Sequence, residues 1–372
     1  MKLPSFGVEE WLNTWEKKAK YDISQSTISA LTLQELIGLD GTTVAEFFGK
    51  YAAEKLNYGW IEGSPEFKKL VAQFYDKVDT TGILQTNGAT GANLLVMYAL
   101  LEPGDEVISI RPSYQQLYDI PKSFGATVNF VDLVEEDRWQ IDLGKLAKLV
   151  SNKTKMICLN SANNPTGTLL QKSVLEQIVQ IARKVNAYVL VDEVYRPFTT
   201  KNDFPSIVDV YERGIATNSL SKTYSLPGLR IGWTASSKKL ANVFRKCRDY
   251  TLICGGVLND ALAVHALKNR QKILARNHQI LAENLKLLTK WSEQEPRVSF
   301  VMPYYVPTAF IRLDIPQDDR SFCTDLLQKT GVLLVPGSAF GVPQHARLGY
   351  CCSKKTLLKG LSLLSEYLQE NF

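Results

Sequence analysis

Residues 219–233 read SLSKTYSLPGLRIGW, and this stretch decides the predicted fold and chemistry. Lys222 follows a β-branched, strand-like run among small hydroxyl residues, and Arg230 comes eight positions later. Eight helical residues would make about two turns, but the Pro-Gly pair between them disfavours a continuous helix. We therefore expect a loop that folds back and brings the guanidinium of Arg230 to an anionic group, with Ser219 and Ser221 as further donors.

Short β-branched runs alternate with helical patterns through most of the chain. The predicted strands are Val107–Ile110, Thr127–Val131, Met156–Leu159, Tyr188–Val191, Ile215–Ser219 and Ile231–Thr234. The predicted helices are Ala92–Leu101, Tyr114–Phe124, Leu143–Val150, Lys172–Val185 and Lys238–Arg248. This alternation predicts an α/β fold in which helices sandwich a mostly parallel sheet. Ligands of such sheets bind at the carboxyl ends of the strands, where the polar candidates of this sequence fall.

The pattern changes after Cys254-Gly-Gly, where a long helical pattern runs from Leu258 to Trp291. The later predicted elements are strands Val298–Val301, Phe310–Leu313, Val332–Val335 and Arg347–Tyr350, a helix at Arg320–Thr330 and a terminal helix from Lys354. They indicate a second, smaller α+β domain. We expect an N-terminal arm of residues 1–35 that contributes to the small domain, a large ligand-binding domain of residues 36–257, and a linking helix with the C-terminal small domain in residues 258–372.

Composition excludes several classes of protein. The 372 residues carry a net charge of +5, from 43 basic and 38 acidic residues, without a basic block. This balance argues against nucleic-acid binding. The six cysteines form no C-x-x-C pair and the three histidines are scattered, so we expect free thiols and no metal centre. The N-terminus lacks an apolar signal segment, and no apolar run approaches the ~20 residues of a membrane span, so we expect a cytoplasmic protein without membrane association.

A phosphate site is predicted at residues 86–93, TNGATGAN, which lead into an apolar helical pattern. Small residues at a helix start leave backbone N–H groups open to an anion, and the helix dipole favours its charge. Gly88 and Ala89 supply this opening, and Thr90 adds a hydroxyl donor. An ordinary capped turn explains the same pattern. The stretch is neither a Walker loop nor a dinucleotide fingerprint, so a nucleotide-binding dehydrogenase is disfavoured.

Two further motifs end predicted strands. Residues 160–167, NSANNPTG, place Asn164 in a turn, and residues 192–195, DEVY, place Asp192 and Tyr195 after an apolar strand. A plain loop and a helix cap are the structural alternatives. A lysine amine condenses with aldehydes, and pyridoxal phosphate (PLP) is the obvious aldehyde cofactor. With PLP, Asp192 would hold the proton of the ring nitrogen, while Asn164 and Tyr195 would donate to the phenolic oxygen.

The blocks NNPTG, DEVY and SLSKTYSLPGLRIGW resemble, in order and spacing, those of class I/II PLP-dependent aminotransferases, which have fold type I and are aspartate-aminotransferase-like. The resemblance covers nearly the whole chain and makes the large domain the PLP-binding one. It implies a Schiff base on Lys222, with Asp192, Asn164 and Tyr195 around the ring. The phosphate would be held by Ala89, Thr90, Ser219, Ser221 and Arg230.

Three more residues take roles from the resemblance alone. Tyr114 matches the aromatic residue that stacks on the cofactor ring, although a core tyrosine fits the pattern equally well. Arg347 matches the arginine that binds the substrate carboxylate, together with Asn164, although strand arginines are more often surface residues. Tyr58 resembles the tyrosine that reaches the phosphate of the neighbouring subunit. The last match implies a homodimer with shared active sites.

The expected reaction moves an amino group between an L-amino acid and a 2-oxo acid. Residues 22–29, DISQSTIS, lack the glycine-containing segment that commonly borders the substrate, and they resemble capreomycidine-synthase-like relatives. A cyclase, a C–S lyase or a racemase therefore stays an alternative, whereas a PLP-binding transcriptional regulator would need a fused DNA-binding domain. No extra arginine indicates a dicarboxylate pocket. Trp60, Tyr118 and Tyr224 are candidates for contacting an apolar substrate side chain.

Overall fold

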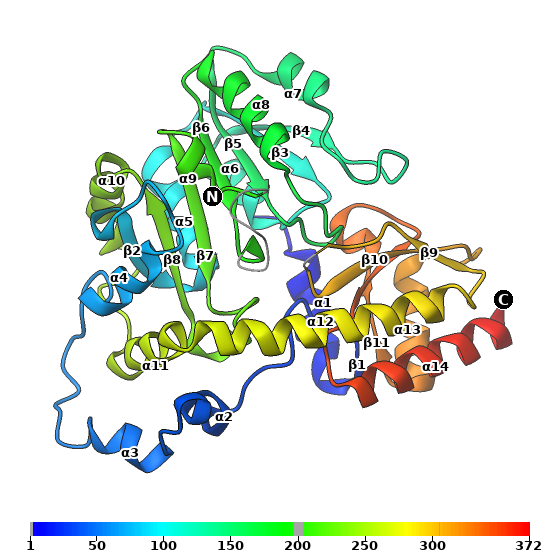
Figure 1. Ribbon diagram of the computed structural model, residues 1–372. Helices are drawn as coiled ribbons and strands as arrows, with labels where there is room; N and C mark the ends of the chain where they lie inside the picture. The colour runs from blue at the N-terminus through cyan, green and yellow to red at the C-terminus, as the bar shows by residue number, and fades with distance from the viewer. Residues whose placement is uncertain (1–2, 197–203, 305) are drawn as a thin grey trace.

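A mixed sheet organises the computed structural model, which describes residues 3–196, 204–304 and 306–372 (Figure 1). Within these residues seven strands pair in the order β2-β8-β7-β6-β5-β3-β4. Their bounds are β2 Ile83–Asn87, β3 Glu106–Arg111, β4 Thr127–Asp132, β5 Thr154–Asn160, β6 Tyr188–Asp192, β7 Gly214–Ser219 and β8 Ile231–Ser236. The pairs from β7 to β4 are parallel, and β8 is antiparallel to both of its neighbours. The predicted mostly parallel sheet is confirmed.

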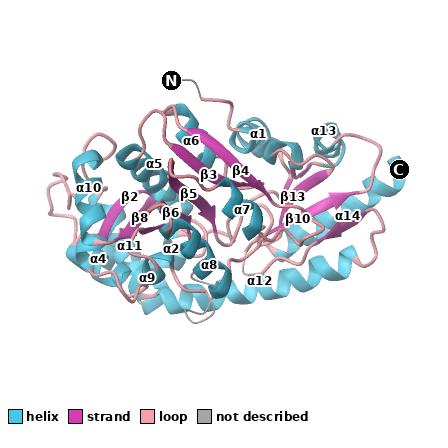
Figure 2. Cartoon of the chain, turned by 90° about the horizontal axis from the view of Figure 1, so that it is seen from above, coloured by secondary structure: helices cyan, strands magenta, loops and turns pink. Residues whose placement is uncertain are grey.

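Helices cover both faces of this sheet (Figures 1 and 2). On strand β5, Met156 and Cys158 pack with residues of α5, α6 and α10, while Ile157 and Leu159 belong to the core under α7 and α8. Successive side chains of a strand point to opposite faces, so one apolar run fills two cores. The helices of this region are α4 Pro65–Ala72, α5 Gly88–Leu100, α6 Gln116–Ser123, α7 Leu143–Leu149, α8 Lys172–Arg183, α9 Ile207–Val210 and α10 Lys238–Arg248.

The C-terminal part contains a second sheet of order β12-β13-β10-β9, flanked by α13 and α14 (Figure 1). Its elements are β9 Val298–Phe300, β10 Thr308–Leu313, α13 Asp319–Thr330, β12 Val335–Pro336, β13 His345–Gly349 and α14 Lys354–Asn371. Strand β1, Tyr21–Asp22, pairs with β11, Val332–Leu333, so the N-terminal arm is tied to the C-terminal part. This pairing supports the proposed division of the chain, which stays a prediction.

The structure corrects three expectations about the elements. Strand β2 was not predicted, because its sequence leads directly into the glycine-rich helix start. The expected helix from Leu258 to Trp291 is two helices, α11 Val257–Lys268 and α12 Arg270–Ser292. Asn269 separates them, and its side chain donates to the backbone carbonyl of His265, a local bond that competes with helix continuation. The strand predicted at 332–335 is split, since β11 and β12 pair in different sheets.

The N-terminal arm begins with α1, Gly7–Trp15, which lies between the large sheet and the C-terminal part (Figures 1 and 2). Trp11 is buried, and its indole Nε1 donates to the carbonyl of Leu334 at 2.8 Å. The backbone N–H of Gly7 donates to Oε1 of Gln115 at 2.8 Å. Helix α1 is therefore anchored to both halves of the molecule.

Two short helices follow the arm, α2 Leu33–Ile37 and α3 Val44–Gly49, and they lie at the lower left of Figure 1. Each begins with a capping box, formed by Thr32 with Glu35 and by Thr43 with Glu46.

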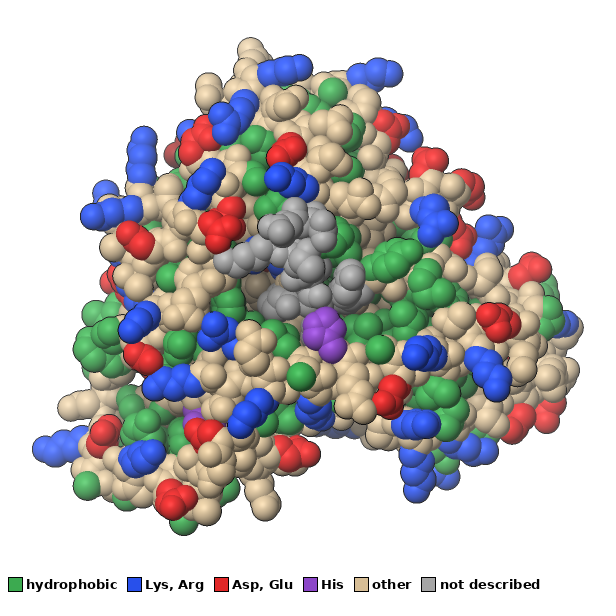
Figure 3. Space-filling model, viewed as in Figure 1, with side chains coloured by type: hydrophobic (Ala, Val, Ile, Leu, Met, Phe, Trp, Pro, Cys, Tyr) green, Lys and Arg blue, Asp and Glu red, His purple; other side chains and the backbone are tan. Residues whose placement is uncertain are grey.

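Charged side chains of both signs are scattered over the face drawn in Figure 3. Among the helices of the described residues, none has the length and apolar character needed to cross a membrane.

Candidate active site

A cavity of about 510 Å³ opens at the carboxyl ends of the central strands. The register explains how it collects polar residues, because Asn160 of β5 lies opposite Asp192 of β6, which lies opposite Thr217 of β7. Strand β2 runs in the same direction and delivers the start of α5 to the same edge. The predicted site residues that line the cavity are Ala89, Thr90, Tyr114, Asn164, Asp192, Tyr195, Ser219, Ser221, Lys222, Arg230 and Arg347.

An anion-binding corner forms where α5 begins. Gly88 has a φ of +67°, and a Cβ added to it would lie 2.6 Å from Nη2 of Arg230. The guanidinium of Arg230 thus lies over the open helix start, and its Nη1 is 3.4 Å from Oγ of Ser221. The segment between them does fold back as expected, through a short 3₁₀ turn at Pro227–Leu229. Helix dipole, hydroxyl and guanidinium all favour negative charge here.

Asp192 ends strand β6 and is 3% exposed. Burial raises the pKa of its carboxyl to about 6, and hydrogen bonds from Asn93 and from the Val194 N–H oppose this rise. Nδ2 of Asn93 donates to Oδ2 of Asp192 at 3.0 Å, and Oγ1 of Thr217 donates to Oδ1 of Asn93 at 2.6 Å. The carboxylate is held by a fully buried relay, which fixes the direction in which it faces the cavity.

Lys222 lies in the turn after β7, and its Nζ donates to Oγ of Ser26 at 2.7 Å. Burial, and after it the charge of Arg347, lower the pKa of the amine to about 8, while Glu9 and Asp192 act in the opposite direction. An amine with such a pKa is partly neutral near neutral pH, so it can act as a nucleophile or accept a proton.

Arg347 lies on β13 and is 1% exposed. Its Nη2 donates to the carbonyl of Ser24 at 2.9 Å, and its Nη1 donates to Oδ1 of Asn164 at 3.2 Å. Its buried Nε has no hydrogen-bond partner among the described residues. An uncompensated guanidinium donor in a cavity wall is suited to a carboxylate ligand.

Two tyrosines complete the wall near Asp192. Tyr195 is buried, and its hydroxyl donates to the carbonyl of Ser26 at 2.9 Å. Tyr114 packs against Phe6 with ring centroids 5.3 Å apart, and burial raises the pKa of its hydroxyl to about 12. The N-terminal segment that includes Phe6 and Ser26 therefore covers the site that the sheet builds.

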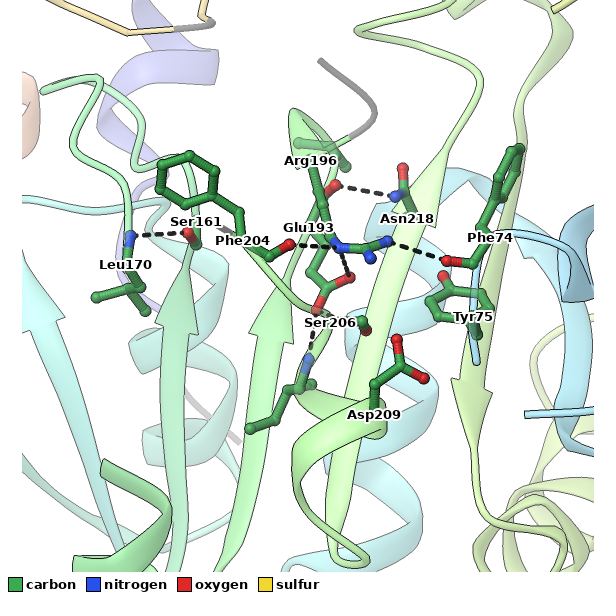
Figure 4. A network of polar contacts seen from close by, with 12 residues as sticks. Phe74, Tyr75, Ser161, Leu170, Glu193, Arg196, Phe204, Ser206, Asp209 and Asn218 are labelled. Carbon is green, nitrogen blue, oxygen red and sulfur yellow. Dashed lines mark hydrogen bonds and ion pairs between the residues drawn. The ribbon is translucent and has the colours of Figure 1, made fainter. Parts of the chain in front are cut away.

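Glu193, next to Asp192, belongs to a separate buried network (Figure 4). Its Oε1 accepts from Oγ of Ser206 at 2.8 Å, and its Oε2 is 3.7 Å from Nε of Arg196. Nδ2 of Asn218 donates to the Glu193 carbonyl at 2.9 Å. Glu193 is not among the described residues that line the 510 Å³ cavity. The network joins the segment that follows β6 to β7, which supports the expected structural role of Glu193.

Several sequence candidates lie outside the cavity. Gly88 does not line it directly and acts through the space that it leaves for Arg230. Tyr58 is 80% exposed in the segment before α4, away from the cavity of its own chain. The aromatic residues considered for an apolar substrate are not among the described residues that line this cavity. Tyr118 and Tyr224 are buried elsewhere, and Trp60 is 61% exposed.

Sequence reasoning missed Asn93, Ser26 and Glu9. Asn93 is a polar residue on the buried face of an otherwise apolar helix, and that contrast could have identified it. Ser26 belongs to the segment 22–29 that departs from the family pattern. Glu9 lies more than 200 residues from Lys222 in the chain, and no local pattern indicates that they meet.

Comparison with known proteins assigns this fold and site to a class. The family model described as aminotransferase class I and II matches residues 51–364, and the chain belongs to this family. An aspartate aminotransferase of Thermotoga maritima is 32% identical over 86% of this chain and 83% of that protein. A capreomycidine synthase of Streptomyces vinaceus is 27% identical over 98% of this chain and 94% of that protein.

Among solved structures, a PLP-dependent aminotransferase from Streptococcus suis 89-1591 is 55% identical and has a TM-score of 0.97, with 100% of this chain and 99% of that chain covered. These similarities confirm the predicted α/β fold, the aminotransferase class and the cofactor, pyridoxal phosphate. The cyclase alternative receives less support, since aminotransferases predominate among the named relatives.

The described residues fit this cofactor. The corner at Gly88, which a Cβ would fill, and the guanidinium of Arg230 suit a phosphate. The buried carboxylate of Asp192 suits a protonated ring nitrogen, and Lys222 in the same cavity suits an aldehyde. The unpartnered Nε of Arg347 suits the carboxylate of an amino acid.

Proposed function

We propose that this aminotransferase binds its cofactor covalently through Lys222 and moves an amino group from an L-amino acid to a 2-oxo acid. The observation that carries the proposal is the convergence of Lys222, Asp192 and Arg347 on one cavity. They come from two different sheets, and each supplies a chemical function that transamination requires.

Bound pyridoxal phosphate supplies an aldehyde that condenses with amines and a ring that accepts the electrons released at the substrate Cα. Asp192 would keep a proton on the ring nitrogen through a charge-assisted hydrogen bond, with Asn93 holding its carboxylate in place. Arg230 would hold the phosphate, with Ala89, Thr90, Ser219 and Ser221. Asn164 and Tyr195 would donate to the phenolic oxygen, and Tyr114 would pack against the ring.

Lys222 and Arg347 handle the substrate. Arg347 binds the α-carboxylate, with Asn164 beside it, and so orients the Cα–H bond toward Lys222. The neutral amine of Lys222 would then act as the general base that removes the Cα proton, and its protonated form would act as the general acid. Its pKa of about 8 keeps a useful fraction of the amine unprotonated near neutral pH.

We further propose a homodimer in which Tyr58 reaches the phosphate of the neighbouring subunit. The support is an exposed apolar group in the segment before α4, with Leu56 83%, Tyr58 80% and Trp60 61% exposed. A cytoplasmic location is proposed as well, and it is supported by six cysteines that are all free thiols.

The decisive experiment compares Lys222→Ala with Lys355→Ala, an exposed lysine on α14. Each protein is saturated with pyridoxal phosphate, treated with borohydride and digested. We expect an adduct on Lys222 in the parent and in the Lys355 variant, and neither adduct nor 2-oxo acid formation in Lys222→Ala. An adduct at another lysine, or normal turnover by Lys222→Ala, would refute the proposal. Product analysis separates transamination from cyclisation, β-elimination and racemisation.

A further inference from the structure

We propose that helix α1 forms the side-chain subsite of the substrate and that Glu9 makes the enzyme select amino donors with a cationic side chain. This inference depends on the function proposed above and names its substrate class. The ligand chemistry is an ammonium or guanidinium group carried by an α-amino acid.

One face of α1 lines the cavity. Glu9, Leu12 and Asn13 of α1 and Glu16 directly after it line the cavity at spacings i, i+3, i+4 and i+7, which places them along a single helix face. Both ends of this face are acidic. Glu9 and Glu10 are both exposed, but only Glu9 is among the described residues that line the cavity.

The other walls of the cavity already have assigned ligand groups. Among the described residues, the cations that line it are Lys222, Arg230 and Arg347. The proposed function assigns them to the substrate amine, the phosphate and the α-carboxylate. Arg347 lines the cavity, and a guanidinium is suited to binding a carboxylate. With both the amino group and the carboxylate of the substrate assigned, the wall that this chain offers to the substrate side chain is α1 and the adjacent segment Gln25–Thr27.

Glu9 acts on this space electrostatically. No hydrogen bond or ion pair occupies the carboxylates of Glu9 and Glu16 among the described residues. Burial is the main cause of the shifted pKa values of Tyr114, Lys222 and Arg347, and the charge of Glu9 is a further cause in all three. The negative charge of Glu9 therefore acts on groups across the cavity. A second substrate carboxylate would meet like charge at this wall, whereas a cation would meet an unpaired carboxylate.

The wall is held in position before any substrate arrives. Trp11, on the opposite side of α1, is fixed by its bond to Leu334, and Gly7 is fixed by Gln115. A Cβ on Gly7 would lie 3.0 Å from the carbonyl of Ala339, so the helix packs closely on its support. A preorganised acidic wall loses little entropy when it binds a cation.

The test uses the PLP-loaded enzyme in two ways. The first is turnover with lysine, ornithine and arginine against aspartate and glutamate as amino donors. The second is binding of 4-guanidinobutyrate against glutarate, followed through the cofactor absorbance. Both probes carry a carboxylate on three methylenes and lack an α-amino group, so they bind without reacting. The variants are Glu9→Gln, Glu9→Lys and the matched control Glu10→Gln.

We expect the parent to prefer the cationic donors and 4-guanidinobutyrate. Glu9→Gln should lower kcat/KM for cationic donors on the order of tenfold, the effect of losing one charge-assisted hydrogen bond. Glu9→Lys should shift the preference toward aspartate, glutamate and glutarate, and Glu10→Gln should change nothing. A parent that prefers dicarboxylates, or a Glu9→Gln enzyme with an unchanged donor profile, would overturn the inference and leave transamination intact. A parent that turns over none of these donors and forms no borohydride adduct on Lys222 would instead overturn the proposed function.

Discussion

Replacing Asn93 with alanine should make the stability of the cofactor-free protein more sensitive to pH. Asp192 has a raised pKa of about 6 against 3.8 for the free side chain. Its contribution to folding stability is therefore present at low pH and is lost as the pH rises through about 6. Above that pH the buried carboxylate depends on its bond from Asn93, which is 3.0 Å long.

The size of this pH-dependent loss of stability follows from the charge on the Asp192 carboxyl group, which accepts the hydrogen bond. A hydrogen bond to a charged group is worth about 1.5–3 kcal/mol and a neutral one about 0.5–1.5 kcal/mol. Asn93→Ala should therefore cost about 1–2 kcal/mol more at pH 8 than at pH 5, which raises the pKa of Asp192 by about one unit. The cavity left by the side chain costs the same at both pH values.

Urea unfolding at pH 5 and pH 8 measures the difference. Asn284→Ala is the matched control, because Asn284 is 3% exposed and donates to two backbone carbonyls far from Asp192 along the chain. Its cost should not depend on pH. Equal costs of Asn93→Ala at both pH values would refute the assignment of Asn93 as the residue that supports the Asp192 carboxylate.

Three further outcomes are expected. Gly88→Ala should weaken cofactor binding, measured by fluorescence titration, because the new Cβ lies 2.6 Å from Arg230. The control Gly341→Ala, which has a left-handed φ as well but open space around it, should lose only stability. Equal cofactor affinity in both variants would contradict the phosphate corner. Arg347→Lys should raise KM for amino donors by about tenfold or more, because an ammonium cannot replace a bidentate guanidinium, and an unchanged KM would remove it from the substrate site. Tyr58→Phe should weaken cofactor affinity only at protein concentrations at which analytical ultracentrifugation shows a dimer. An effect on the cofactor affinity of a monomer would exclude the shared site.

Local patterns predicted most of the fold. The β-branched runs of β3 to β8 and the amphipathic pattern of α10 carry their own signals, because each apolar period matches the element that it forms. The break at Asn269 and the split at Leu334 were missed. The break at Asn269 depends on a local side-chain bond to the carbonyl of His265, which an apolar period does not reveal. The split at Leu334 depends on distant strands, because β11 pairs with β1 and β12 pairs with β13.

The sequence by itself determined the cofactor chemistry of this protein. The residues proposed to hold pyridoxal phosphate follow strand ends, and parallel strands bring their carboxyl ends to one edge, so motif and topology give the same answer. Only the tertiary structure placed Glu9 and Ser26 in the cavity with Lys222 and Arg347, because the N-terminal arm reaches it by pairing β1 with β11 and packing Trp11 under Leu334. Contacts between segments so distant in the chain depend on packing of the whole molecule, and no local pattern of residues encodes them.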